Sequence, residues 1–129
     1  MEIIQHRRNS INSLKSTPSK FGVEVDVRTF NSKLIISHEP YVKGDNFNDW
    51  LGYYNHGTLI INVKEEGLED EIISCLKKYN IKSYFFLDQS FPSLLKTSSL
   101  GNKNCAVRVS EYECIETALK LQDKISWVW

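Results

Sequence analysis

Apolar and polar residues alternate along much of this chain with the period of a β-strand. The clearest case is Phe21–Arg28, in which three valines occupy one face and Glu24, Asp26 and Arg28 occupy the other. Seven segments are predicted as strands: Glu2–His6, Phe21–Arg28, Leu34–His38, Thr58–Lys64, Lys82–Asp88, Cys105–Ser110 and Ile125–Trp129.

Helical periodicity fills most of the intervals between these strands. Leu68–Tyr79 carries acids in its first turn and lysines in its last, which is the charge order that the helix dipole favours. Pro92 and Gly101 mark the start and end of another helix. Five segments are predicted as helices: Ser10–Ser16, Asn46–Tyr54, Leu68–Tyr79, Ser90–Leu100 and Glu113–Gln122, the last burying Ile115, Ala118 and Leu119.

The alternation of strands and helices indicates an α/β fold with a parallel sheet covered by helices. Two architectures fit this pattern: a (β/α)8 barrel and a doubly wound open parallel sheet. A turn at Asn31–Lys33 precedes the third strand. Because no linker interrupts the pattern, residues 1–129 are predicted to form a single domain.

Composition excludes several classes of function. The 16 basic residues equal the 16 acidic ones, so the chain lacks the basic excess that general binding to nucleic acid or anionic membranes requires. No apolar run approaches the roughly 18 residues of a membrane span, and no signal peptide is visible. Three cysteines without a CxxC pair favour a reducing, cytoplasmic location.

Two acidic residues stand out within the strands. Glu24 and Asp26 share one face, and burying two unpaired carboxylates there would cost several kcal/mol. A divalent cation, Mg²⁺ or Ca²⁺, would resolve the conflict, whereas an exposed strand face would need none. On the next long strand, Asn62 offers a carbonyl oxygen and Lys64 a positive charge suited to a phosphate.

Ionisable residues also gather where the predicted strands end, which is where active sites of parallel α/β folds lie. His6 and His38 occupy two of these positions and can serve as a general acid and a general base. Three further residues are candidates for a substrate pocket: Asp88, Arg108 and Glu111.

Three motifs in order, His6-Arg7, Glu24-x-Asp26 and Ile35-Ile36-Ser37-His38-Glu39-Pro40, resemble those of the glycerophosphodiester phosphodiesterase family. The resemblance covers roughly Ile4–Lys64 by motif and the remainder by strand rhythm. It implies a TIM-type barrel, a phosphoric diester hydrolase of lipid metabolism, and a small phosphodiester as the substrate.

The resemblance also implies roles for individual residues. His6 and His38 match the acid and base pair, and Arg7 matches a phosphate contact. Glu24 and Asp26 match ligands of a bound Mg²⁺ or Ca²⁺. Where the family usually has Glu-x-Lys, this chain has Asn62-Val63-Lys64. Lys64 therefore matches a phosphate contact, while Asn62 puts a neutral oxygen at a metal-ligand position.

Length qualifies this interpretation. The predicted parallel strands recur about every 25 residues, so eight units would need about 200 residues or more. The chain would then hold about five and a half units of a barrel that is incomplete at its C-terminus. A homo-oligomer could cover the open strand edges.

Three other functions remain open. The chain could be a non-catalytic phosphate- or metal-binding module, which the neutral Asn62 favours, or an inactive remnant of a longer barrel. A flavodoxin-like signalling domain would suit the length, but it predicts acids where His6 and Arg7 stand.

Overall fold

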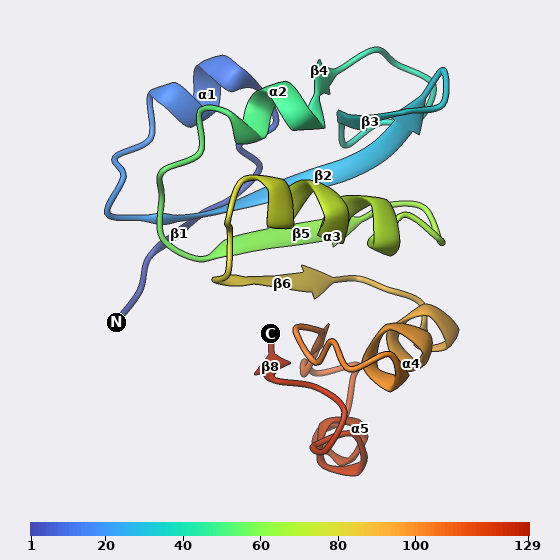
Figure 1. Ribbon diagram of the computed structural model, residues 1–129. Helices are drawn as coiled ribbons and strands as arrows, with labels where there is room; N and C mark the ends of the chain where they lie inside the picture. Colours follow the sequence, from blue (N-terminus) through green and yellow to red (C-terminus); the bar gives the residue numbers. More distant parts are fainter.

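Eight strands and five helices follow one another along residues 1–129, all of which the computed structural model describes (Figure 1). The strands are β1 (Ile4–Gln5), β2 (Gly22–Phe30), β3 (Lys33–Ile36), β4 (Asp45–Asn46), β5 (Leu59–Val63), β6 (Tyr84–Leu87), β7 (Ala106–Val107) and β8 (Trp127–Val128). The helices are α1 (Ile11–Lys15), α2 (Phe47–Leu51), α3 (Glu69–Lys78), α4 (Phe91–Ser99) and α5 (Ile115–Lys120). Every predicted element is present at its expected place, and β4 is additional.

The strands form a mixed sheet, and this overturns the predicted fold class. The order is β4-β3-β2-β5-β6, and β1 also pairs with β2. β2 is parallel to β1 and β5, and β5 is parallel to β6, but β3 is antiparallel to both β2 and β4. Strands β7 and β8 form a separate parallel pair. The prediction of a parallel (β/α)8 barrel of about five and a half units is therefore wrong, and so is the all-parallel open sheet.

A tight hairpin between β2 and β3 is the physical reason for this difference. Phe30 pairs with Lys33, so the loop consists of Asn31 and Ser32 alone. Both residues have positive φ, 50° and 57°, as the central residues of a type I′ turn require. A two-residue loop reverses the chain, whereas a parallel connection needs a crossover of a dozen or more residues.

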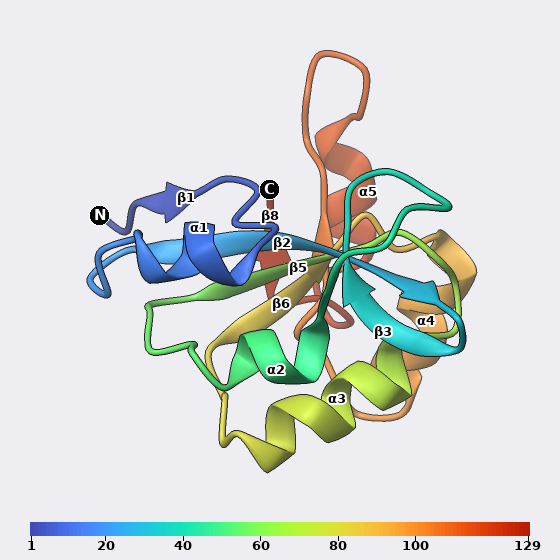
Figure 2. The same cartoon turned by 90° about the horizontal axis from the view of Figure 1, so that it is seen from above.

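One edge of β2 is consequently divided between two partners. β1 pairs with Gly22 and Val23 at the beginning of β2, and β3 pairs with the segment from Val27 to Phe30 at its end. Since β1 runs with β2 and β3 runs against it, the two short strands point toward each other along this edge. Figure 2 shows β1 and β3 near opposite ends of β2.

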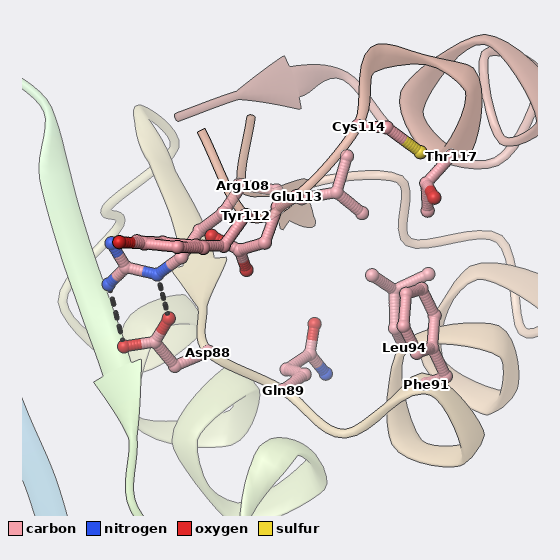
Figure 3. Close-up of a pocket in the computed structure, with 11 residues that line it drawn as sticks. Asp88, Gln89, Phe91, Leu94, Arg108, Tyr112, Glu113, Cys114 and Thr117 are labelled. Carbon is pink, nitrogen blue, oxygen red and sulfur yellow. Dashed lines mark hydrogen bonds and ion pairs between the residues drawn. The ribbon is translucent and has the colours of Figure 1, made fainter. Parts of the chain in front are cut away.

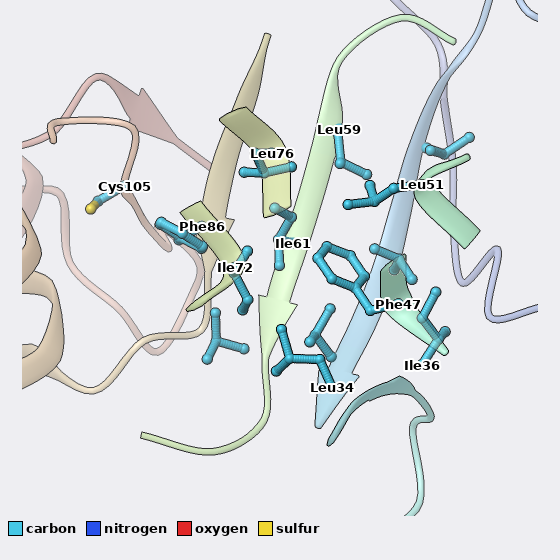
Figure 4. Close-up of a cluster of buried hydrophobic side chains, with 14 of the residues drawn as sticks. Leu34, Ile36, Phe47, Leu51, Leu59, Ile61, Ile72, Leu76, Phe86 and Cys105 are labelled. Carbon is cyan, nitrogen blue, oxygen red and sulfur yellow. The ribbon is translucent and has the colours of Figure 1, made fainter. Parts of the chain in front are cut away.

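The main core lies between the sheet and the helices. The alternating valines of β2 and the odd-numbered residues of β5 are buried against apolar side chains of the helices, with Trp50 and Phe47 the largest. Figure 4 shows Phe47 of α2 and Ile72 of α3 beside Ile61 of β5. Figure 2 shows α2 and α3 along this side of the sheet. Each valine of β2 is fully buried, which contributes roughly 1.5–3 kcal/mol per side chain.

The opposite face of the sheet carries a smaller apolar cluster of Ile60, Phe85, Leu87 and Ala106. Trp127 of β8 stacks on Phe85 with ring centroids 4.5 Å apart. The even-numbered residues of β2 and β5 also point to this side. None of the helices is long and apolar enough to cross a membrane.

Candidate active site

Both candidate histidines lie on segments that bond to the middle of β2. After β1, the backbone N–H of Arg8 donates to the carbonyl of Glu24 (2.8 Å), and after β3 the N–H of Ser37 donates to the carbonyl of Asp26 (3.1 Å). His6 and His38 therefore approach the same three-residue stretch of β2 from opposite directions. The hairpin, and not a shared strand direction, brings them together.

Both acidic residues of β2 are buried, so the alternative of an exposed strand face is wrong. Glu24 is 1% exposed and Asp26 is fully buried. Each has charged or polar partners. Oε2 of Glu24 accepts the backbone N–H of Arg7 at 2.8 Å and lies 3.7 Å from Nε2 of His6. Oδ1 of Asp26 lies 3.0 Å from Nζ of Lys64.

Asn9 completes the surroundings of Asp26. Its Nδ2 donates to Oδ2 of Asp26 at 2.6 Å, and its Oδ1 accepts the backbone N–H of Asp26 at 2.9 Å. Sequence reasoning missed this residue because the contact spans 17 positions. The available signal was its place directly after His6-Arg7-Arg8 and before the N-cap Ser10 of α1.

Arg7 links the two histidines through its backbone and its side chain. Its φ is 52°, a left-handed conformation that costs a non-glycine residue of the order of 1 kcal/mol or more. Its N–H donates to Glu24, while Nη2 contacts Nε2 of His38 at 2.9 Å. Residues held in unfavourable backbone conformations cluster at functional sites, and Arg7 fits that pattern.

The contacts of His38 define its tautomer. A guanidinium can only donate, so Nε2 of His38 must be the acceptor of the bond from Arg7. The proton is then on Nδ1, which donates to Oε1 of Glu39 at 2.6 Å. With its side chain 37% exposed, His38 presents a neutral imidazole with a basic Nε2. The side chain of His6 is 69% exposed, and its Nε2 is directed at the carboxylate of Glu24.

The oxygen atoms near β2 suit a hard cation in their chemistry. Asp26 and Asn62 are neighbours across the β2–β5 pairing, and Oδ1 of Asn62 is buried without a hydrogen-bond partner. Glu24 lies two residues before Asp26 on the same strand face. No three His, Cys, Asp or Glu side chains are grouped so that they could hold a metal ion. The oxygens that could contribute to a cation site here are those of these two carboxylates and this amide. Lys64 already neutralises part of their charge.

Asp88 and Arg108 form a separate ion pair at the ends of β6 and β7. Nε and Nη2 of Arg108 donate to the two oxygens of Asp88 at 2.6 and 2.9 Å. Burial alone would raise the pKa of Asp88. The hydrogen bonds and charge of Arg108, with smaller effects of Lys64 and Asn62, outweigh burial and lower that pKa. The bond to Asp88 raises the pKa of Arg108.

The third candidate pocket residue, Glu111, is exposed and has no hydrogen bond or ion pair. Its near neighbour Glu113 is held instead, since Ser110 Oγ donates to Oε2 of Glu113 at 3.0 Å. Periodicity could not distinguish these two acids, because both lie in an irregular loop before α5.

Seven of the sequence-predicted residues thus gather beside β2 and β5, while Asp88 and Arg108 lie next to them. The seven are His6, Arg7, Glu24, Asp26, His38, Asn62 and Lys64. Comparison with protein-family models, curated proteins and solved structures finds no match for this chain.

Proposed function

We propose that this protein cleaves a small phosphodiester with the help of Mg²⁺ or Ca²⁺, using His38 as the general base and His6 as the general acid. The observation that supports this most is the convergence of both histidines and Arg7 on the buried Glu24 and Asp26. It brings proton acceptors, proton donors and fixed positive charge to one stretch of β2.

The contacts of each histidine assign its role. Nε2 of His38 carries a lone pair and takes the proton of the attacking water or hydroxyl, because Nδ1–H is directed to Glu39. As the new P–O bond forms and the bond to the leaving oxygen breaks, His6 donates its proton to that oxygen. Glu24 holds the ring of His6 from one side, with Oε2 of Glu24 3.7 Å from Nε2 of His6.

Positive charge from the protein balances the phosphate. The guanidinium of Arg7 can turn from His38 to a non-bridging oxygen, which also releases the lone pair of His38. The side chain of Lys64 is 19% exposed, and its ammonium can reach a second oxygen. A cation held by Glu24, Asp26 and Asn62 would add Lewis-acid stabilisation of the phosphate charge.

Two substrates test the assignment of the histidines. In bis(p-nitrophenyl) phosphate the leaving group needs no proton, whereas in a glycerol phosphodiester the leaving alkoxide does. We expect His38→Ala to reduce turnover of both by about 10²–10⁴-fold, and His6→Ala to reduce only the second by that amount.

His56→Gln is the matched control, since His56 contacts the backbone carbonyl of Thr17 and none of the residues of the candidate active site. Its turnover should equal that of the wild type. Activity that is unchanged by EDTA would overturn the cation requirement, and activity that survives both histidine substitutions would overturn the proposal.

A non-catalytic phosphate- or metal-binding module is the second candidate. One observation favours it: Asn62 places a neutral amide beside Asp26, where the resemblance implies a carboxylate. Calorimetric binding of Mg²⁺ or of a phosphodiester without any turnover would select this function over the first.

We also infer a reducing, cytoplasmic compartment. Its support is that Cys75, Cys105 and Cys114 are all free thiols.

A further inference from the structure

His38 lies near the start of a loop that makes few backbone hydrogen bonds. β3 ends at Ile36 and β4 begins at Asp45, so residues 37–44 form this loop. Residues 40–44 take part in no hydrogen bond between backbone groups. Ser37 is the last residue before β4 whose backbone bonds to β2, through the carbonyl of Asp26. A contact other than the strand ladder must therefore hold the backbone of His38.

The side chain of Arg28 supplies that contact. Its Nε donates to the carbonyl oxygen of His38 at 3.1 Å, and this is the one hydrogen bond that the backbone of His38 makes. Arg28 comes from β2 itself and shares a strand face with Glu24 and Asp26, since residues two apart point the same way. The bond therefore ties the loop to the strand that carries the buried acids.

The guanidinium of Arg28 is itself fixed in place. Its side chain is 18% exposed, and Nη1 lies 3.9 Å from Oε1 of Glu65. Glu65 is held in turn, because the backbone N–H of Thr29 donates to Oε1 at 3.2 Å and Oγ1 of Thr29 donates to Oε2 at 2.6 Å. A chain of contacts thus runs from the end of β2 through Glu65 and Arg28 to His38.

Arg28 uses its donors differently from Arg108. Nε and Nη2 of Arg108 both donate to the carboxylate of Asp88, as the dashed lines in Figure 3 show, so that pair depends on opposite charges. Nε of Arg28 donates instead to a neutral carbonyl, for which a donor atom at the right place suffices. The contact with His38 therefore depends on the position of Nε and not on the positive charge.

The place of the His38 backbone matters because both ring nitrogens have a specific partner. Nε2 accepts from Arg7 at 2.9 Å, and Nδ1 donates to Glu39 at 2.6 Å. Both contacts require that the ring starts from a fixed point of the backbone. A misplacement of about 1 Å at a reacting group can reduce turnover by about 10²-fold.

We propose that Arg28 is a positioning residue. Its Nε–H fixes the backbone of His38, and thereby the orientation of the imidazole that removes the proton of the attacking water or hydroxyl. This role rests on the function proposed above, in which His38 is the general base. Arg28 itself touches neither the phosphate nor the transferred proton, and reacting groups need supporting hydrogen bonds of this kind to keep their geometry.

Three substitutions at Arg28 separate the donor atom from the charge. In Arg28→Gln the amide nitrogen occupies the place of Nε and can still donate to His38, whereas Arg28→Met puts a methyl group there. Both variants lose the charge and the contact with Glu65, so the difference between them isolates the hydrogen bond. Arg28→Lys keeps the charge without a nitrogen at that place.

Turnover of bis(p-nitrophenyl) phosphate measures the effect, because its leaving group needs no proton and the reaction reports on the general base. We expect Arg28→Met to lower kcat about ten-fold and to change KM by less than about two-fold, while Arg28→Gln keeps at least about half of the wild-type kcat. Equal kcat values in these two variants would overturn the proposal. Activity kept by Arg28→Lys and lost by Arg28→Gln would also overturn it, because Arg28 would then be a contact of the phosphate.

The imidazole of His38 gives a second measurement that needs no turnover. Long-range proton–nitrogen correlation spectra show which ring nitrogen carries the proton, and the signals of His38 are those that His38→Ala lacks. We expect the proton on Nδ1 in the wild type and in Arg28→Gln, and signals averaged between the two tautomers in Arg28→Met. The same tautomer in all three proteins would overturn the positioning role.

These measurements distinguish the positioning role from the catalytic proposal. If the wild type shows no turnover, a tautomer that changes in Arg28→Met but not in Arg28→Gln supports the positioning role and refutes the catalytic proposal alone. Turnover that requires His38 but is equal in every Arg28 variant refutes the positioning role alone.

The wild type also tests the hydrogen bond directly, should urea melts show that Arg28→Met does not fold. The Nε–H of Arg28 should exchange with solvent at least about ten-fold more slowly than that of the exposed Arg7, whose Nε makes no hydrogen bond. Equal exchange rates for the two groups would overturn the proposal.

Discussion

Replacing Lys64 with Met should destabilise the protein more than replacing its partner Asp26 with Asn. The two side chains form an ion pair of 3.0 Å in which Asp26 is fully buried and Lys64 is 19% exposed. Two unit charges at this distance attract each other by about 5.5 kcal/mol in a medium with an effective dielectric constant of about 20. Part of that attraction offsets the desolvation of Asp26, and this desolvation remains when Lys64 is removed.

The remaining partner decides the magnitude in each variant. In Lys64→Met, Asp26 keeps only the hydrogen bond from Asn9, so we expect a loss of about 3 kcal/mol in the free energy of unfolding. In Asp26→Asn, the amide can still bond to Asn9, and Lys64 can extend into solvent. That variant should lose about 1 kcal/mol.

Urea denaturation followed by circular dichroism measures both losses, with Lys82→Met as an exposed lysine control. The titration is repeated with Mg²⁺ and with EDTA. Because Lys64→Met removes the competing positive charge, a divalent cation at ten times its Kd should restore about 1.4 kcal/mol. A larger loss in Asp26→Asn, or an equal effect of Mg²⁺ on the wild type and Lys64→Met, would refute this reasoning.

Three further predictions concern other parts of the chain. The folded-state pKa of Asp88 lies below its ordinary value of 3.8, so its ion pair with Arg108 stabilises the folded chain at pH 7. Arg108→Gln should therefore lower the free energy of unfolding, measured in urea melts, by about 1 kcal/mol at pH 7, and this loss should vanish as the pH falls through the folded-state pKa of Asp88. Burial raises the pKa of the Cys105 thiol to about 12, so iodoacetamide at pH 8 should alkylate the exposed Cys114 and spare Cys105 until the chain unfolds, as mass spectrometry would show. Asn9→Ala should cost about 2 kcal/mol in the same urea melts, since it leaves a donor and an acceptor of Asp26 unpaired; a loss under about 0.5 kcal/mol, which is the scatter of surface substitutions, would contradict its role.

Local patterns in the sequence predicted the elements well, because the spacing of apolar residues in each segment indicates which of its side chains must be buried. The valines of β2 and the acids between them are assigned to opposite faces by their alternation alone, and the structure confirms that assignment. The same reasoning fails for α5, where Ala118 is buried as predicted but Ile115 and Leu119 are 47% and 57% exposed. Helical spacing identifies an apolar stripe, but it does not show whether a neighbouring element covers that stripe.

The predicted parallel architecture is wrong at the connection between β2 and β3, although the sequence there indicates a hairpin. The turn at Asn31–Lys33 was predicted, yet five residues between Arg28 and Leu34 are too few for a crossover to a parallel strand. A connection of this length predicts that β3 is antiparallel to β2. Strand β4 has two residues, which is too short for alternation to reveal.

The error in strand direction also changes why the candidate site exists. Sequence reasoning placed His6 and His38 together because both followed strands of a parallel sheet. In the structure, β3 runs against β2, so its end lies level with the middle of β2. β1 stops after two residues at the other side of that stretch. The edge of β2 at Glu24–Asp26 therefore stays free of a regular strand, and the two segments that carry histidines bond to it instead. A β1 longer by three residues, or a β3 without its hairpin, would fill this edge with ladder hydrogen bonds and leave no place for the histidines beside the buried acids.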